Sequence, residues 1–143
     1  MKSRIINQQP RTVVMVFDVG DEAASGLLQA AREHKLSAAQ ISGIGGFSDV
    51  KLGFFDQQKK DYLPITINEQ VEVVSLLGNV ALTSKGEPKI HVHCTVGKRD
   101  GSAHAGHLLE GHVRPTLEVI MIEAPQHLQR YHDEATGLAL LKL

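Results

Sequence analysis

The sequence predicts an α+β fold in which a mainly antiparallel β-sheet packs on one N-terminal α-helix. One segment early in the chain has apolar residues at spacings of three and four, which is the period of a helix. Most later segments alternate apolar and polar residues, which is the period of a strand, and turn signals separate them. The length of 143 residues predicts a single domain over residues 1–143, with no room for two full cores.

The first elements are an expected strand and helix. Residues 12–17 are a continuous apolar run, typical of a buried strand. Asp21 is expected to cap the helix that follows, and Glu22 to lie in its first turn, where an anion is favourable. The apolar stripe predicts that this helix continues to about Lys35.

Short strands fill most of the remaining chain. The glycine-rich stretch 43–46 lacks the spacing of a dinucleotide or phosphate loop, so it is interpreted as a tight strand connection. The polar stretch 125–137 is expected to hold a short helical turn, and 138–143 to close as a last strand. The other expected strands are 39–44, 49–56, 63–67, 71–83, 89–96, 103–113 and 117–123, and the turns between them are 57–60, 84–88, 98–101 and Arg114-Pro115.

Composition excludes several classes of protein. Lys plus Arg is 15 and Asp plus Glu is 16, so the chain lacks the basic excess of most nucleic-acid binders. Its apolar stretches are too short for a signal peptide or a transmembrane helix, so we expect no association with a membrane. A single cysteine cannot form an internal disulfide, which favours a cytoplasmic location. Aromatic residues are only 4%, so the core must be aliphatic.

Two histidines lie inside one expected strand. Alternation along residues 89–96 puts His91 and His93 on one face and Cys94 on the other. Cys94 is therefore expected to be a small buried hydrophobic residue rather than a partner of the two histidines.

The following turn predicts a third histidine on the same face. Residues 99–101 suit a three-residue hairpin loop with a left-handed glycine, which makes Lys98 face Ser102. Counting outward, His93 then faces His107 across the antiparallel pair. A loop of two or four residues would instead put His107 on the opposite face, so the prediction depends on the register.

Three imidazoles with one open position are a typical ligand set for zinc or a similar divalent transition metal. The alternative is three surface or interface histidines without a metal. A catalytic metal needs a general base nearby, but alternation is expected to turn Glu110, the nearest acid in sequence, away from His107. The catalytic residues therefore stay unassigned. The other histidines are expected to be solvated or hydrogen-bonded, with His104 and His112 on the face opposite His107; they are His34, His104, His112, His127 and His132.

Several strings along the chain fit one known pattern. They are residues 41–45, 73–79, 90–93, 97–101, 106–111, 115–119 and 131–138. Together they resemble the plants-and-prokaryotes conserved (PPC or PCC) domain over nearly the whole chain. The resemblance implies an antiparallel sheet with a packed helix and a homotrimer. Prokaryotic single-domain members look like metal proteins, and their His-x-His and Gly-His-Leu positions fall on His91, His93 and His107.

In plant relatives of this family the domain follows AT-hook segments that bind DNA. This chain has no Arg-Gly-Arg-Pro core, so DNA as a partner rests on analogy alone. A trimer would also carry a formal charge of about −3, which disfavours DNA. The predicted function is a metal-binding homotrimeric regulatory protein, a candidate DNA-binding protein without an AT-hook. The alternative is a metal-dependent enzyme or sensor acting on a small-molecule ligand.

Overall fold

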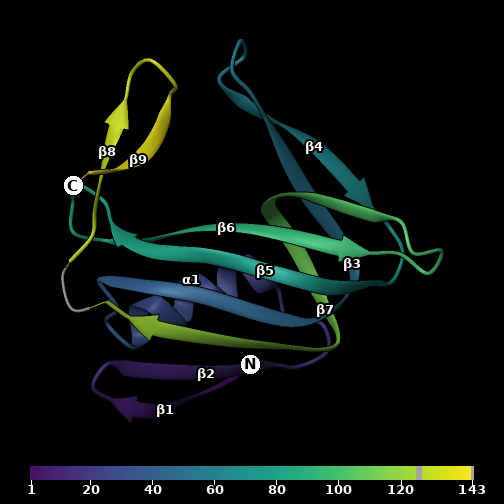
Figure 1. The fold of residues 1–143 in the computed structure, drawn as a ribbon, viewed down its shortest axis with the longest axis horizontal. Coiled ribbons are helices and arrows are strands. Elements are labelled where there is room, and N and C mark those ends of the chain that lie inside the picture. Colours follow the sequence, from purple (N-terminus) through teal and green to yellow (C-terminus); the bar gives the residue numbers. More distant parts are fainter. Residues whose placement is uncertain (125–126, 143) are drawn as a thin grey trace.

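A computed structural model describes residues 1–124 and 127–142 of the chain. The described residues form one α-helix and nine β-strands (Figure 1). In chain order these elements are β1 (Lys2–Gln8), β2 (Arg11–Phe17), α1 (Ala23–Glu33), β3 (Ala38–Asp56), β4 (Asp61–Ile67), β5 (Val71–Leu82), β6 (Pro88–Gly97), β7 (Ala103–Glu123), β8 (Gln129–Asp133) and β9 (Leu138–Lys142).

The strands form one sheet, and the helix lies behind it (Figure 1). The strand order is β1-β2-β7-β3-β5-β8-β9, with β4 paired to β3 and β6 paired to both β5 and β7. Among the described strands, only the single bridge between β5 and β8 is parallel. The predicted α+β class, a mainly antiparallel sheet packed with a helix, is therefore confirmed.

The hydrophobic core lies between α1 and the sheet. Leu27 and Ala31 of the helix are fully buried, as are Met15, Ile41 and Met121 of the strands that it covers. The core is mainly aliphatic, as the low aromatic content predicts. Every second residue of these strands points to the opposite face of the sheet, and many of those residues are exposed.

The helix begins one residue later than predicted. Glu22, not Asp21, is the N-cap: its carboxylate accepts hydrogen bonds from the backbone N–H groups of Ala24 and Ser25 at 2.8 and 2.7 Å. The same carboxylate accepts a third bond, from the backbone N–H of Gly111 in β7, at 3.2 Å. Glu22 therefore both caps α1 and ties it to the sheet.

Strands β3 and β7 are each longer than predicted, because two expected connections are bulges inside them. Pro115 has no N–H to donate, and the register of β3 with β7 jumps there from Gly45–Leu117 to Phe47–Val113. Gly45 has a φ of +156°, and a Cβ at this position would overlap the backbone of β7. The glycine-rich stretch and the proline thus mark a distorted ladder rather than chain reversals.

Two strands were not predicted. Strand β1 is a mostly exposed edge strand paired only with β2, so its burial pattern is weak. Strand β8 lies within 125–137, and the single helical turn expected there follows it, where the backbone N–H of Gly137 donates to the carbonyl of Asp133 at 2.7 Å. Strand β8 pairs with β9, which lies in the expected last strand. Residues 125–126 and 143 of these expectations lie outside the described residues. In the described part of the chain, α1 is too short to cross a membrane.

Candidate metal centre

The β6–β7 hairpin has the predicted register. The backbone N–H of Lys98 donates to the carbonyl of Ser102 at 2.8 Å, and Gly101 has a φ of +83°. Further along the ladder His93 pairs with His107. The loop chemistry therefore fixes which face of β7 carries His107, and that face is the one that also carries the histidines of β6.

The three predicted histidines converge. The Nε2 atoms of His91 and His93 lie 3.2 Å apart, and the centroids of their rings lie 5.2 and 5.5 Å from that of His107. One nitrogen from each ring lies within 4.8 Å of the others. Two nitrogens on a tetrahedral zinc ion lie about 3.4 Å apart. The spacing of the first pair already suits a shared metal ion, and His107 offers a third nitrogen within 4.8 Å of both.

The electrostatics of the cluster also suit a metal. Burial, and then the neighbouring His91, His93 and Lys89, lower the pKa of His107 to about 4. Burial likewise lowers the pKa of His91, with His93 and two cations adding to the effect. Both rings are therefore neutral at pH 7, which is the form that binds a metal. The Nδ1 atom of His107 is buried and has no hydrogen-bond partner among the described residues.

Cys94 is not part of the cluster. It pairs across the ladder with Gly106 and its side chain lies in the core, as predicted. Burial raises the pKa of its thiol to about 12, so it is neither a ready nucleophile nor a ready ligand.

A tyrosine that sequence reasoning missed stacks on the cluster. The ring of Tyr62, on β4, lies parallel to that of His107 with centroids 4.6 Å apart and 22° between the planes. Gly53 makes this possible: it pairs with His107 in the β3–β7 ladder, and a Cβ there would lie 2.7 Å from Cδ1 of Tyr62. A glycine inside an alternating strand was the available signal for a close approach.

The predicted positions of Glu110 and His112 need correction. Leu52 pairs with Leu108 and Lys51 with Glu110, so the register skips one residue of β7. Glu110 and His112 therefore lie on the same face as His107, not on the opposite face as predicted. Glu110 still contributes no carboxylate to the cluster, because it pairs with Lys51 at 3.2 Å. In the described part of the chain, the converging group contains histidines only.

Most of the remaining histidines have structural roles, as expected. His112 bonds to Asp49 at 2.7 Å, which is the first cause of a raised pKa for His112. His34 bonds to Ser3 and His127 to Ser37. His104 pairs with the buried Val96, so it lies on the face opposite His107, as predicted.

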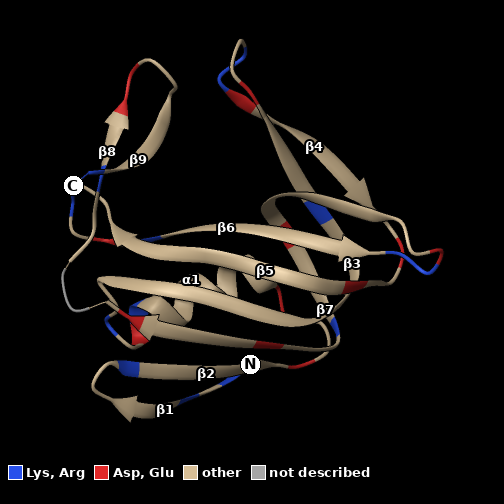
Figure 2. Cartoon of the chain, in the orientation of Figure 1, with Lys and Arg blue, Asp and Glu red and all other residues tan. Residues whose placement is uncertain are grey.

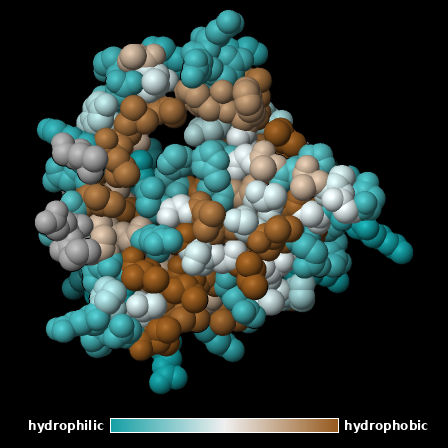
Figure 3. Space-filling view, in the orientation of Figure 1, coloured by the Kyte–Doolittle hydropathy of each residue, from teal (hydrophilic) through white to brown (hydrophobic). Residues whose placement is uncertain are grey.

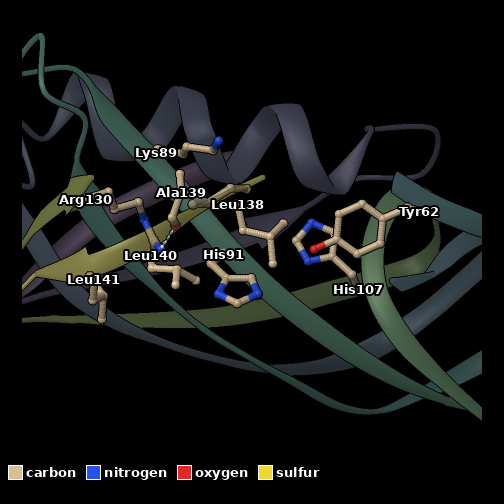
Figure 4. A pocket seen from close by; sticks show the side chains of 10 residues that line it. Tyr62, Lys89, His91, His107, Arg130, Leu138, Ala139, Leu140 and Leu141 are labelled. Atoms are coloured by element: carbon tan, nitrogen blue, oxygen red, sulfur yellow. Dashed lines mark hydrogen bonds between the residues drawn. The ribbon is translucent and has the colours of Figure 1, made fainter. Parts of the chain in front are cut away.

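A cavity of about 310 Å³ opens beside the cluster. It lies between the β3–β4 and β8–β9 hairpins, where the surface is hollowed (Figures 1 and 3). Sequence reasoning missed most of it, because no local pattern relates residues 130–141 to His91. The residues that line it, most of them labelled in Figure 4, are Tyr62, Lys89, Ile90, His91, His107, Arg130, Leu138, Ala139, Leu140 and Leu141.

Solved structures from several prokaryotes share this fold. A plant- and prokaryote-conserved (PPC) protein of Pyrococcus horikoshii is 31% identical with a TM-score of 0.85, over 93% of this chain and 92% of that chain. A metal-containing protein of Archaeoglobus fulgidus is 29% identical with a TM-score of 0.84, over 99% and 97%. A candidate DNA-binding protein of Ralstonia eutropha JMP134 is 32% identical with a TM-score of 0.84, over 92% and 90%. None of the curated proteins gives a significant match.

The comparison with family models agrees with the structural likeness. The Plants and Prokaryotes Conserved (PCC) domain matches residues 5–125, a range that contains all three clustered histidines and the strands that carry them. The chain belongs to the Plants and Prokaryotes Conserved domain family.

Proposed function

We propose that this PCC-domain protein, as one domain over residues 1–143, binds a zinc-type divalent metal through His91, His93 and His107. The observation that carries the proposal is the convergence of three imidazole nitrogens within 4.8 Å on two paired strands. The related metal-containing protein of Archaeoglobus fulgidus supports it. The three histidines would leave a fourth position open for a ligand, and a metal bound there would supply Lewis-acid chemistry.

Metal content per chain tests this proposal. Mass spectrometry of the purified native protein is expected to find about one zinc-type ion per chain. His107→Ala should lose the ion, whereas His104→Ala should retain it, because His104 lies on the opposite face of the same strand. Retention by the His107 variant, or no metal in the wild type even after reloading, would overturn the proposal.

We also propose that the protein assembles as a homotrimer, as the family resemblance implies. The sheet face opposite α1 exposes large apolar side chains, which Figure 3 shows in brown. Its members, each 41–60% exposed, are Val16, Ile44, Val74, Leu77, Ile120 and Ile122. Apolar side chains gathered on one face are typical of an interface. Leu77 is the ladder partner of His93, so this face extends to the metal cluster.

Light scattering during gel filtration tests the assembly. The wild type is expected to have the mass of three chains, and Leu77→Lys should reduce it to one by placing a charge in the interface. Val19→Lys is the matched control, because Val19 is also exposed but precedes α1 in a turn. A monomeric wild type would refute the trimer, and an unchanged Leu77→Lys would refute this face.

The cavity beside the cluster favours a small-molecule sensor or enzyme over a DNA-binding regulator. Its ten lining residues include His91 and His107, so a ligand bound there would lie beside two of the three proposed metal ligands. We expect a small molecule to raise the melting temperature more strongly when the metal is bound.

DNA binding is the second candidate, because proteins of Bacteroides thetaiotaomicron and Ralstonia eutropha that share this fold are candidate DNA-binding proteins. Figure 2 shows Lys and Arg in scattered positions, many beside acidic residues. Lys51 and Lys98 are each paired with an acid. Duplex affinity that falls steeply with salt would support DNA binding, whereas no binding at low salt would exclude it.

A further inference from the structure

We infer that the cavity beside the cluster binds a small carboxylate with a hydrocarbon tail. The carboxylate lies at the end formed by His91, Lys89 and Arg130, and the tail lies against the leucines of β9. The inference rests on the proposed metal site in one respect: the tightest binding is expected when the metal is present. The cations of the cavity belong to the chain itself, however, so they can be tested with and without a metal.

The charges around the cavity are the first support. Its lining contains two cations, Lys89 and Arg130, and no Asp or Glu. Neither cation forms an ion pair with a described residue. The three histidines can contribute no negative charge, and a divalent metal would add two positive charges. A partly buried site with this excess of positive charge is completed by an anion.

Arg130 is the second support. Its side chain is only 6% exposed, and it donates through Nη1 to the carbonyl of Ala139 at 3.0 Å and through Nη2 to Oδ1 of Asn79. Its Nε is buried and has no partner among the described residues. Asn79 is the ladder partner of His91, so the guanidinium is held next to a proposed metal ligand (Figure 4). A buried donor left unpaired in this way is costly unless a ligand accepts from it.

The walls decide which anion fits best. Leu138, Leu140, Leu141 and Ile90 form an apolar side that gives a hydrocarbon tail a place to be buried. Arg130 uses two of its five N–H donors on Ala139 and Asn79, so its guanidinium keeps three donors for an anion. A carboxylate accepts from these donors as inorganic phosphate does, but a carboxylate with a hydrocarbon tail also covers the apolar side of the cavity.

Calorimetric titration with hexanoate tests the inference on zinc-loaded and metal-free protein. Hexanoate is expected to bind both forms, more tightly with zinc. Hexanol, hexylamine and inorganic phosphate should each bind at least about tenfold more weakly, because each lacks the charge or the tail. Hexanol or phosphate binding as tightly as hexanoate, or no hexanoate binding to either form, would overturn the inference. Hexanoate binding without any zinc uptake would instead contradict only the proposed metal site.

Charge variants locate the site. Lys89 is exposed, so Lys89→Met should fold and should weaken hexanoate binding about fivefold while leaving hexanol binding unchanged. Lys85→Met is the matched control, because Lys85 is an exposed lysine in the preceding turn that does not line the cavity. Arg130→Gln should weaken hexanoate binding further while the zinc content stays the same. An equal effect of the Lys85 and Lys89 variants would refute the assignment.

Discussion

Acidification should lower the free energy of unfolding of the metal-free protein, because the buried His107 ring is neutral in the folded chain. The pKa of this ring falls from its ordinary value of 6.5 to about 4 in the folded chain, chiefly through burial. At pH 5, therefore, His107 is mostly protonated in the unfolded chain and mostly neutral in the folded chain. The stability that depends on neutral His107 is complete above pH 6.5 and is lost as the pH falls towards 4. Between pH 7.5 and 5.0 the loss is about 2 kcal/mol, or about 4–8 °C in melting temperature.

Urea unfolding at fixed protein concentration measures this loss, with His107→Gln compared with the wild type at both pH values. Other groups also titrate, so the informative quantity is the difference between the two proteins in how much stability each loses. His107→Gln should lose about 2 kcal/mol less than the wild type, whereas His104→Gln should behave as the wild type does. An equal loss in His107→Gln and wild type would refute the assignment of the low pKa to this ring.

Three further predictions test the surroundings of the site. Glu22→Ala should lower the free energy of unfolding by about 1 kcal/mol, because it removes the N-cap of α1; urea unfolding against Glu33→Ala checks this. Gly53→Ala should displace Tyr62 from His107, because the new Cβ lies 2.7 Å from Cδ1 of Tyr62, so the pKa of His107 should rise above 4 in an NMR titration. The same titration should give His112 a pKa above 6.5, and Asp49→Asn should lower it again, because the bond to Asp49 is the main cause of the raised value.

The histidine cluster was predictable because it depends on local rules. The period of β6, the three-residue loop and the period of β7 are all encoded within residues 89–107, and together they place three side chains on one face. No contact with a distant segment is needed to decide the register. Spacing alone, however, left the metal-free alternative open. The metal hypothesis was favoured only by the resemblance to the PPC domain and by what that resemblance was taken to imply.

The rest of the cavity was not predictable, because distant segments supply it. Arg130 bonds to Asn79, the ladder partner of His91, and one parallel bridge, between Leu82 and Gln129, joins its strand to β5. The bulges in β3 and β7 were predicted as connections between strands, and this prediction was wrong for a related reason. Glycine and proline signal that the ladder is interrupted, but only the paired strand decides whether the chain turns or continues.

The metal cluster and the apolar face lie on the same side of the sheet, and this ties the proposed functions together. His93 is exposed in a single chain, and its ladder partner Leu77 is a central member of the proposed interface. A neighbouring subunit packed on Leu77 would also lie close to His93, and this would change the solvation of a proposed metal ligand. By linkage, a metal that strengthens assembly is bound more tightly by the assembled form, and by the same factor. If both proposals hold, assembly of the chain and binding of the metal are coupled equilibria, so each constant has to be measured with the other held fixed.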